Sequence, residues 1–417
     1  MKSNKQYEDK KRDCYELLSY LESNYKEQYD EILKIIGSSS DDGVHGFIIC
    51  ARNNALNIYH YGQSVAKIYL VEDKDNNKTP RYEVSDFFIT GKKTGNKSTY
   101  KELSFGEFTK CYGTIIKNVV KNATGKRDDV EKQQVHRERI CQQWIMNNCN
   151  KSKESDWYYI DMEYVDAIRP FGRFDMVAVR KTPKNGKHEV ALVELKVTNG
   201  AYGTTLSTSK NLEKQKIIER KYDILKENLF AKDTDKEDYS MYELEKVKYG
   251  SGIVSHIADY LRYLNSGQYS LQLKQEIINA IKVYKKLGIL PDDKLNDIDT
   301  LADLADKPTI YILSYTKAPF ISNDKYSSLR SLKTSFYNQL YNDGRKNGSK
   351  YCLERLIDKK YYEEIWNIKD VLKKAIKDDT DNIIEIDQTV NNNNKYTFII
   401  KFFEPDNCER EAWDCLE

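Results

Sequence analysis

The sequence lacks any long apolar run. No stretch of its 417 residues approaches the ~18 consecutive apolar residues of a membrane-spanning helix. The first residues, MKSNKQYEDKKRDCYELL, also lack the apolar segment of a secretory signal peptide. We therefore expect a cytoplasmic protein with no membrane partner.

An excess of one charge sign is lacking too. The 67 lysines and arginines balance 65 aspartates and glutamates, so composition alone does not indicate a nucleic-acid-binding protein. Eight cysteines without paired spacing fit a reducing compartment better than a disulfide framework. The five histidines show no metal-binding spacing, and neither a phosphate-binding P-loop nor a G-x-S-x-G elbow occurs. Zinc enzymes, kinases and serine hydrolases are therefore unsupported.

Hydrophobic periodicity divides the chain into two parts. Residues 1–128 predict an N-terminal α+β region that serves DNA recognition or oligomerisation. Its expected elements are a helix over 5–36 and strand-like runs at 45–52, 55–61, 65–72 and 82–89. Residues 129–417 predict a second domain with a helical insertion at about 205–248 and a C-terminal extension of helices and strands.

The second domain has a characteristic order of elements. Expected helices cover 129–148, 251–264, 268–287, 325–341 and 351–375, and expected strands cover 157–165, 173–180, 189–197, 309–315, 383–390 and 396–403. Without the insertion, the order from 129 to 315 is helix, three strands, two helices, strand. This order predicts an α/β fold whose mixed sheet carries helices on both faces.

A hairpin in this domain places three charges on one face. The Asn-Gly pair in KNGK, residues 184–187, is the strongest short signal for a two-residue type I′ turn. If these two residues form the loop, Asp175 lies opposite Lys196 and Val177 lies opposite Glu194. Since side chains alternate along strands and paired residues share a face, Asp175, Glu194 and Lys196 all project from the same side.

Apolar residues surround these charges. The expected neighbours on the same face are Val177, Val179, Val190 and Leu192. The expected reverse face is apolar throughout and comprises Phe174, Met176, Ala178, Val193, Leu195 and Val197. Two carboxylates this close to an apolar core repel each other unless a cation neutralises them.

Magnesium suits such a site, because it takes oxygen ligands and accepts one or two carboxylates, waters and a substrate phosphate. Phosphodiester hydrolysis uses such a metal to polarise the phosphoryl group and to lower the pKa of a bound water. Lys196 is placed to orient that water and to offset negative charge in the transition state. The alternative is an ordinary salt bridge between Lys196 and one of the two acids.

These residues resemble the PD-(D/E)xK nuclease superfamily. The similar motifs are GRFD, residues 172–175, and VELK, residues 193–196. The resemblance implies a restriction-endonuclease-like core of helix, three strands, helix and strand over about 129–315. It also implies that Asp175 and Glu194 bind a divalent metal, that the Leu195 carbonyl adds a ligand, and that Lys196 assists the nucleophile. Here Phe174 replaces the proline that precedes the aspartate in the nominal motif.

Four further residues are candidates. Family members often add an acidic metal ligand from the helix before the first strand, and Glu138 fits that position; a solvent-facing glutamate is the alternative. His256 and Tyr260 lie on the helix that often lends a polar residue to bind nucleic acid; a histidine at the core edge with a local partner is the alternative. Arg173 contacts a phosphate or only flanks its strand.

The sequence therefore predicts a Mg²⁺-dependent DNA endonuclease of restriction or phage-defence type, with Mn²⁺ as a substitute metal. An RNA nuclease and an inactive, nuclease-fold protein that binds nucleic acid are the alternatives. Cutting both strands of a duplex generally needs two sites, so we expect a homodimer.

Overall fold

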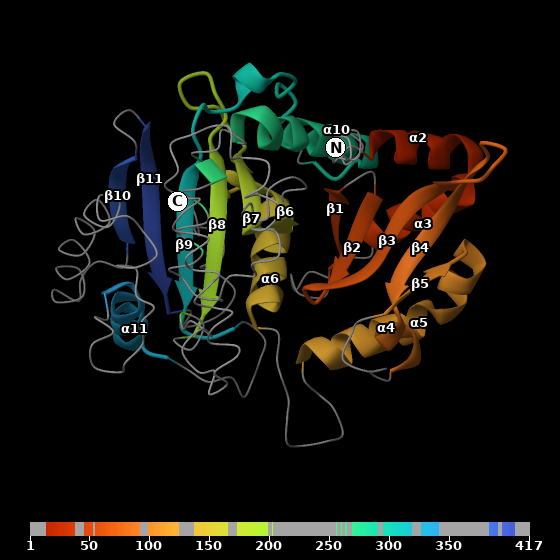
Figure 1. Cartoon of the computed structure of the whole chain (residues 1–417), viewed down its shortest axis with the longest axis horizontal. Coiled ribbons are helices and arrows are strands. Elements are labelled where there is room, and N and C mark those ends of the chain that lie inside the picture. Colours follow the sequence, from red (N-terminus) through yellow and green to blue (C-terminus); the bar gives the residue numbers. More distant parts are fainter. Residues whose placement is uncertain are drawn as a thin grey trace, which may run out of the picture.

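The computed structural model describes most of the two expected domains (Figure 1). The described residues are 14–37, 46–52, 55–91, 99–124, 137–165, 173–198, 202, 256, 260, 263–264, 269–290, 295–318, 327–341, 383–390 and 394–404. The expected insertion at 205–248 and the expected helix at 351–375 lie outside them, as does the predicted boundary near 128. The expected helix at 251–264 is described only at His256, Tyr260, Tyr263 and Leu264.

The N-terminal part contains a five-stranded antiparallel sheet, here called the first sheet, in the order β1-β2-β3-β4-β5. Its strands are β1 (Ile48–Arg52), β2 (Ala55–His60), β3 (Gln63–Glu72), β4 (Lys78–Ser85) and β5 (Tyr100–Leu103). Its helices are α2 (Tyr15–Asn24), α3 (Lys26–Gly37), α4 (Asp86–Thr90) and α5 (Phe105–Thr124). This is the predicted α+β composition.

The single helix expected over 5–36 is wrong within the described residues. Tyr25 has φ −138° and ψ 52°, which ends α2 and separates it from α3. The hydroxyls of Tyr20 and Tyr25 both donate to the carbonyl of Lys78, at 2.9 and 3.3 Å. These bonds attach the bend to the start of β4, so the two helices follow the curvature of the sheet.

The strand expected over 82–89 is also partly wrong. The strand ends at Ser85, and Asp86–Thr90 forms the short helix α4, whose last turn is closed by a left-handed Gly91 with φ 70°. Strand β5 and the long helix α5 were not predicted.

The C-terminal part contains a six-stranded mixed sheet, here called the second sheet, in the order β10-β11-β9-β8-β7-β6. Its strands are β6 (Trp157–Val165), β7 (Arg173–Arg180), β8 (Val190–Val197), β9 (Thr309–Tyr315), β10 (Ile383–Val390) and β11 (Asn394–Phe403). Strands β8, β9 and β11 are parallel to one another, and the other neighbours are antiparallel. The terminal strand pair thus extends the predicted mixed sheet.

Helices cover both faces of the second sheet, as predicted. Helix α6 (Arg137–Lys151) packs on the face formed by Met176, Ala178, Ala191, Val193 and Leu195, here called the α6 face. The opposite face of the sheet, here called the α10 face, is formed by Val177, Val179, Val190 and Leu192. Helix α10 (Lys274–Leu287) packs in the same core as these residues. Helix α11 (Leu329–Tyr341) lies beside β11 (Figure 1). None of the helices in the described ranges is long and apolar enough to cross a membrane.

The β7–β8 hairpin has the predicted turn but a shifted register. Asn185 and Gly186 both have positive φ, 53° and 76°, and Lys184 bridges Lys187. Beyond the turn, however, Val177 pairs with Leu192 instead of Glu194. Residues 181–183 oppose His188 alone, and Pro183 has no N–H for a ladder bond. The shift is two residues, which preserves the face of every side chain.

Phe174 departs from the prediction for the reverse face. Its ring packs against Tyr164, Tyr260 and Tyr263, with centroid distances of 5.5, 4.8 and 5.1 Å, and belongs to the core of the α10 face. Its partner strand β6 adopts a left-handed conformation at Glu163, with φ 53°, which turns Tyr164 toward that face. Sequence alternation cannot reveal such a local reversal.

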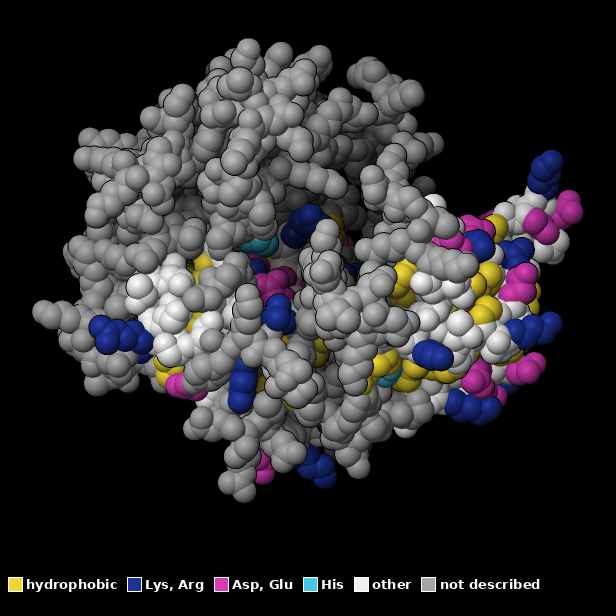
Figure 2. Space-filling view, turned by 90° about the horizontal axis from the view of Figure 1, so that it is seen from below, with side chains coloured by type: hydrophobic (Ala, Val, Ile, Leu, Met, Phe, Trp, Pro, Cys, Tyr) yellow, Lys and Arg dark blue, Asp and Glu magenta, His cyan; other side chains and the backbone are white. Residues whose placement is uncertain are grey.

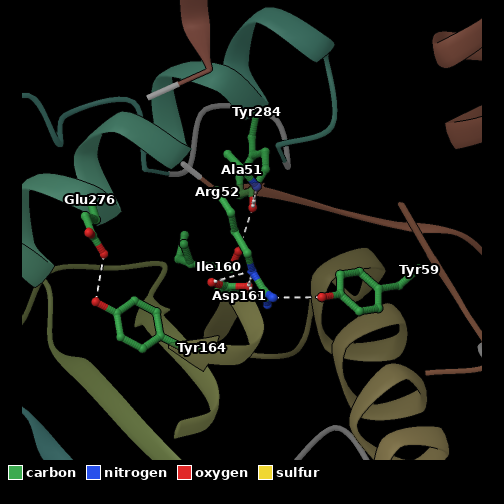
Figure 3. Close-up of polar contacts among 8 residues, drawn as sticks. All are labelled: Ala51, Arg52, Tyr59, Ile160, Asp161, Tyr164, Glu276 and Tyr284. Atoms are coloured by element: carbon green, nitrogen blue, oxygen red, sulfur yellow. Dashed lines mark hydrogen bonds and ion pairs between the residues drawn. The ribbon is translucent and has the colours of Figure 1, made fainter. Parts of the chain in front are cut away.

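The two sheets share one apolar core and are joined by a buried polar cluster (Figure 3). Arg52, at the end of β1, forms an ion pair with Asp161 of β6, and its side chain also donates to the Tyr59 hydroxyl at 2.7 Å. From α10, the Tyr284 hydroxyl donates to the carbonyl of Ile160 at 2.6 Å. These contacts link β1, β6 and α10, so the first sheet is packed directly on the second.

A second junction holds the β2–β3 turn against α6. Gly62 has φ 66°, and its N–H donates to Oε1 of Gln143 at 2.6 Å. A Cβ at this position would lie 2.3 Å from the carbonyl oxygen of Arg139. The first turn of α6 is therefore in direct backbone contact with the first sheet.

We expect Gly62→Ala to destabilise the protein by about 2–5 kcal/mol, because about 1–2 kcal/mol arise from the left-handed conformation and about 1–3 kcal/mol from overpacking. Urea denaturation measures the loss. Gly186→Ala is the matched control, since Gly186 has φ 76° and a Cβ there would have no other atom within 4 Å. Equal losses in the two variants would contradict the close packing of the turn on α6.

Candidate functional site

The predicted charged residues meet where β7 begins and β8 ends. Asp175 is the third residue of β7, and Glu194 and Lys196 are near the end of β8. The β7–β8 ladder ends at the pair Met176–Val193, so Asp175 is not paired with Lys196 as predicted; its side chain instead bonds the Leu195 N–H just beyond the ladder. Figure 2, viewed toward this end of the second sheet, shows acidic, basic and histidine side chains in a hollow near the middle of the molecule. We define the strand-end cluster as the following six residues: Asp175, Glu194, Lys196, Glu138, His256 and Tyr260.

Glu194 is the centre of this cluster and is 1% exposed. Its Oε2 accepts a hydrogen bond from the Tyr260 hydroxyl and lies 3.2 Å from Nδ1 of His256. Its Oε1 lies 2.6 Å from Nζ of Lys196 but accepts no hydrogen bond of good geometry from the described residues. Burial alone would raise the pKa of Glu194, but the charges of His256 and Lys196 hold it well below its usual value.

Lys196 is 4% exposed and interacts with three carboxylates. Besides Glu194, its Nζ lies 3.5 Å from Oε1 of Glu138. Burial would lower the pKa of Lys196, but the negative charges of Glu194, Asp175 and Glu138 outweigh it and raise the pKa. The ammonium is therefore charged at neutral pH.

Asp175 is half-buried and accepts a hydrogen bond from the backbone N–H of Leu195 to Oδ2, at 2.7 Å. The N–H and the carbonyl of a strand residue lie on the same edge of the strand, so the Leu195 carbonyl also points toward β7. Burial raises the pKa of Asp175 well above its usual value, and the charge of Glu194 raises it further. The positive charge of Lys196 opposes these two effects.

Glu138 reaches the cluster through its contact with Lys196, and its predicted role as a metal ligand stays a prediction. It lies in the first turn of α6, and its side chain is 37% exposed. Burial raises the pKa of Glu138, and the charge of Lys196 opposes this effect. Arg173, by contrast, is exposed at the start of β7.

His256 and Tyr260 contact Glu194, which the sequence did not predict. Burial would lower the pKa of His256, but the charge of Glu194 raises it to about 9. Tyr260 is 1% exposed, and its ring packs against Phe174 at 4.8 Å. Tyr260 is thus a buried hydrogen-bond partner of Glu194. The predicted contact with nucleic acid would require its ring to become exposed.

Sequence reasoning missed two buried hydroxyls beside Lys196. Ser314 of β9 is the register partner of Lys196 and is fully buried. Tyr202, which follows β8, is also fully buried. A serine inside the apolar run TIYILSY was a visible signal, but the parallel pairing of β8 and β9 was needed to interpret it.

The oxygen donors of the site suit a hard cation. Within the described ranges, no group of three or more His, Cys, Asp or Glu side chains could hold a metal ion. The available donors are the carboxylates of Asp175 and Glu194 and the Leu195 carbonyl, and Oε1 of Glu194 lacks a well-formed hydrogen bond. Magnesium needs only one or two carboxylates when water and phosphate complete its shell.

Among the described residues, the cysteines Cys14, Cys50, Cys111, Cys141 and Cys149 are free thiols. No family model, curated protein or solved structure matches the chain. The resemblance to PD-(D/E)xK nucleases therefore remains a prediction.

Proposed function

We propose that the protein is a metal-dependent endonuclease that hydrolyses phosphodiester bonds of DNA. Asp175, Glu194 and the Leu195 carbonyl would bind Mg²⁺, or Mn²⁺ in its place, and Lys196 would act on the attacking water. A restriction-endonuclease-like core over about 129–315 would carry this site, and the biological setting would be restriction or phage defence. A homodimer would supply the second site for cutting a duplex.

One observation carries this proposal: Glu194 and Lys196 are buried beside Asp175 at the end of an otherwise apolar face. Burying an ion pair costs several kcal/mol per ion, and apolar replacements of such pairs are often neutral or stabilising. Folding therefore gives no reason for three ionisable groups here. A catalytic site does, because perturbed pKa values and desolvated charges are what phosphate chemistry uses.

A bound divalent cation would polarise the scissile phosphoryl group and lower the pKa of a water. The residues of the chain would position the cation and the attacking water. Asp175 and Glu194, which lie close together just beyond the end of the β7–β8 ladder, would fix the position of the cation. Lys196, which is charged and buried, would orient the attacking water and stabilise negative charge on the phosphate oxygens.

The contacts of Glu194 favour one alternative. Lys196, His256 and Tyr260 all contact its carboxylate, so these partners must yield if a metal binds there. A protein that binds nucleic acid without cutting it would keep this closed arrangement. RNA is the alternative substrate for an active enzyme.

Incubation of the full chain with supercoiled plasmid, single-stranded DNA and RNA tests the proposal. We expect DNA cleavage in Mg²⁺ or Mn²⁺ and none in EDTA, because both carboxylates need a cation. Gel electrophoresis of the products measures it. The conversion of supercoiled to linear DNA without accumulation of nicked circles would support a dimer.

Glu189→Gln is a suitable control variant, since Glu189 lies on the same hairpin but pairs with Arg180 away from the cluster. It should cleave as the wild type does. Cleavage in EDTA would exclude the metal site, and cleavage of RNA alone would change the substrate. Binding of DNA without cleavage in any metal would favour the inactive alternative.

A further inference from the structure

Tyr202 and Ser314 carry buried hydroxyls that interact with each other but make no hydrogen bond of normal geometry. Both residues are 0% exposed, and neither hydroxyl makes a hydrogen bond of normal geometry with the described part of the chain. A buried polar group without a partner costs about 1–3 kcal/mol, so such groups in native proteins require an explanation.

Both hydroxyls lie beside Lys196. Ser314 is paired with Lys196 across the parallel β8–β9 ladder, where neighbouring strands are about 4.8 Å apart. Burial raises the pKa of Tyr202, while the Ser314 hydroxyl and the charge of Lys196 act in the opposite direction. Ser314 thus links the two residues, because it is paired with Lys196 and its side chain interacts with Tyr202.

The ammonium of Lys196 would lose its main partner when a cation binds. Its contact with Glu194 is 2.6 Å, whereas its contact with Glu138 is 3.5 Å. A cation bound to Glu194 would compete for that carboxylate and repel the ammonium. Lys196 would remain buried with three N–H donors, and each of the two hydroxyl oxygens can accept one.

We propose that Tyr202 and Ser314 are positioning residues for Lys196, whose ammonium moves from Glu194 to their hydroxyl oxygens when a divalent cation binds Glu194. This inference rests on the metal site of the proposed function. The two hydroxyl oxygens would accept hydrogen bonds from the ammonium once a cation occupies Glu194. Ser314 is on the strand next to Lys196, and Tyr202 packs against Phe336 of α11 with a centroid distance of 5.7 Å.

Titration of the full chain with Mn²⁺ by calorimetry tests this role without a nuclease assay. We expect Tyr202→Phe and Ser314→Ala each to weaken Mn²⁺ binding about 10-fold, the value of one hydrogen bond to a charged group. In a Lys196→Met background, the same two substitutions should leave Mn²⁺ affinity unchanged, because the ammonium that needs the acceptors is gone.

If the Tyr202 hydroxyl had a structural role, its removal would lower the melting temperature. The proposed role predicts no such loss. Tyr202→Phe removes only an unsatisfied oxygen, so its melting temperature should equal or exceed that of the wild type. Tyr159→Phe, at a fully buried tyrosine of the α6 face, is the matched control and should bind Mn²⁺ normally.

The outcomes separate this inference from the proposed function. The inference is supported if Tyr202→Phe and Ser314→Ala weaken Mn²⁺ binding in the wild type but have no effect in the Lys196→Met background. If the wild type binds Mn²⁺ through Glu194 but Tyr202→Phe and Ser314→Ala bind equally well, or remain weaker than their parent in the Lys196→Met background, the inference is overturned and the metal site stands. If Glu194→Gln binds Mn²⁺ as the wild type does, both are overturned.

Discussion

Replacement of Asp175 by asparagine is expected to reduce DNA cleavage by about 100- to 1,000-fold or more, the usual loss when one charge-stabilising group is removed from a catalytic site. Asparagine retains an oxygen that can accept the Leu195 N–H bond, so the strand ends should keep their structure. It cannot carry the charge that a divalent cation requires. Initial rates of plasmid cleavage in Mg²⁺ measure the effect.

The same substitution should stabilise the metal-free protein at neutral pH. The pKa of Asp175 is raised in the folded state by burial and by Glu194, so its ionised form opposes folding above the unfolded pKa of about 3.9. Asparagine removes that penalty. Below about pH 4, both states of the wild type bind the proton, and the advantage of Asp175→Asn should disappear.

Thermal unfolding in EDTA at pH 7 and at pH 4 checks this sign. Glu189→Gln, which lies outside the cluster, should show no comparable gain. A variant that loses activity and is also less stable at pH 7 would mean that Asp175 has a structural role, and the proposed metal site would lose its main support.

Replacement of Asp161 by alanine is expected to destabilise the protein by about 3–5 kcal/mol, because it leaves the charge of Arg52 buried without its counter-ion. The two side chains are only 7% and 13% exposed, so water cannot replace the lost partner. Their ion pair joins β6 to β1, and its loss should therefore loosen the junction between the two sheets. The urea midpoint and the slope of the transition measure both effects.

The double variant Arg52→Met with Asp161→Leu is the informative comparison. It removes both charges, so its stability should be close to that of the wild type. A small loss for Asp161→Ala alone, below about 1 kcal/mol, would show that the pair is solvated as surface pairs are. A large loss for the double variant would instead assign the stability to the hydrogen bonds of this cluster.

The local geometry of the site was predictable from sequence. The Asn-Gly turn and strand alternation predicted one face for Asp175, Glu194 and Lys196. In the structure Lys196 contacts Glu194, and Asp175 bonds the N–H of the intervening Leu195, although alternation fails at the neighbouring Phe174. The exact register was not predictable, since Pro183 removes a ladder bond and residues 181–183 bulge opposite His188. Because the shift is an even number of residues, it changes which residues are directly opposite each other without changing their faces.

Contacts between residues far apart in the chain could not be predicted from the sequence. Arg52 and Asp161 lie 109 positions apart, and no local pattern links them. The same applies to Ser314 and Lys196, which meet only because β8 and β9 are parallel neighbours. The break at Tyr25 lacked a proline or glycine signal, since it depends on hydrogen bonds to the distant Lys78. Sequence patterns thus predict the face of most strand residues, with Phe174 as an exception, and tertiary pairing decides which residues meet across that face.

The position of β11 in the second sheet has a consequence for biosynthesis. Strand β9 lies between β8 and β11, yet β11 is translated only after α11 and β10. A nascent chain that has reached α11 therefore presents one edge of the apolar β9, with unpaired amide and carbonyl groups that can recruit another polypeptide. Until β11 emerges from the ribosome, this edge is the place where a chaperone would be most useful.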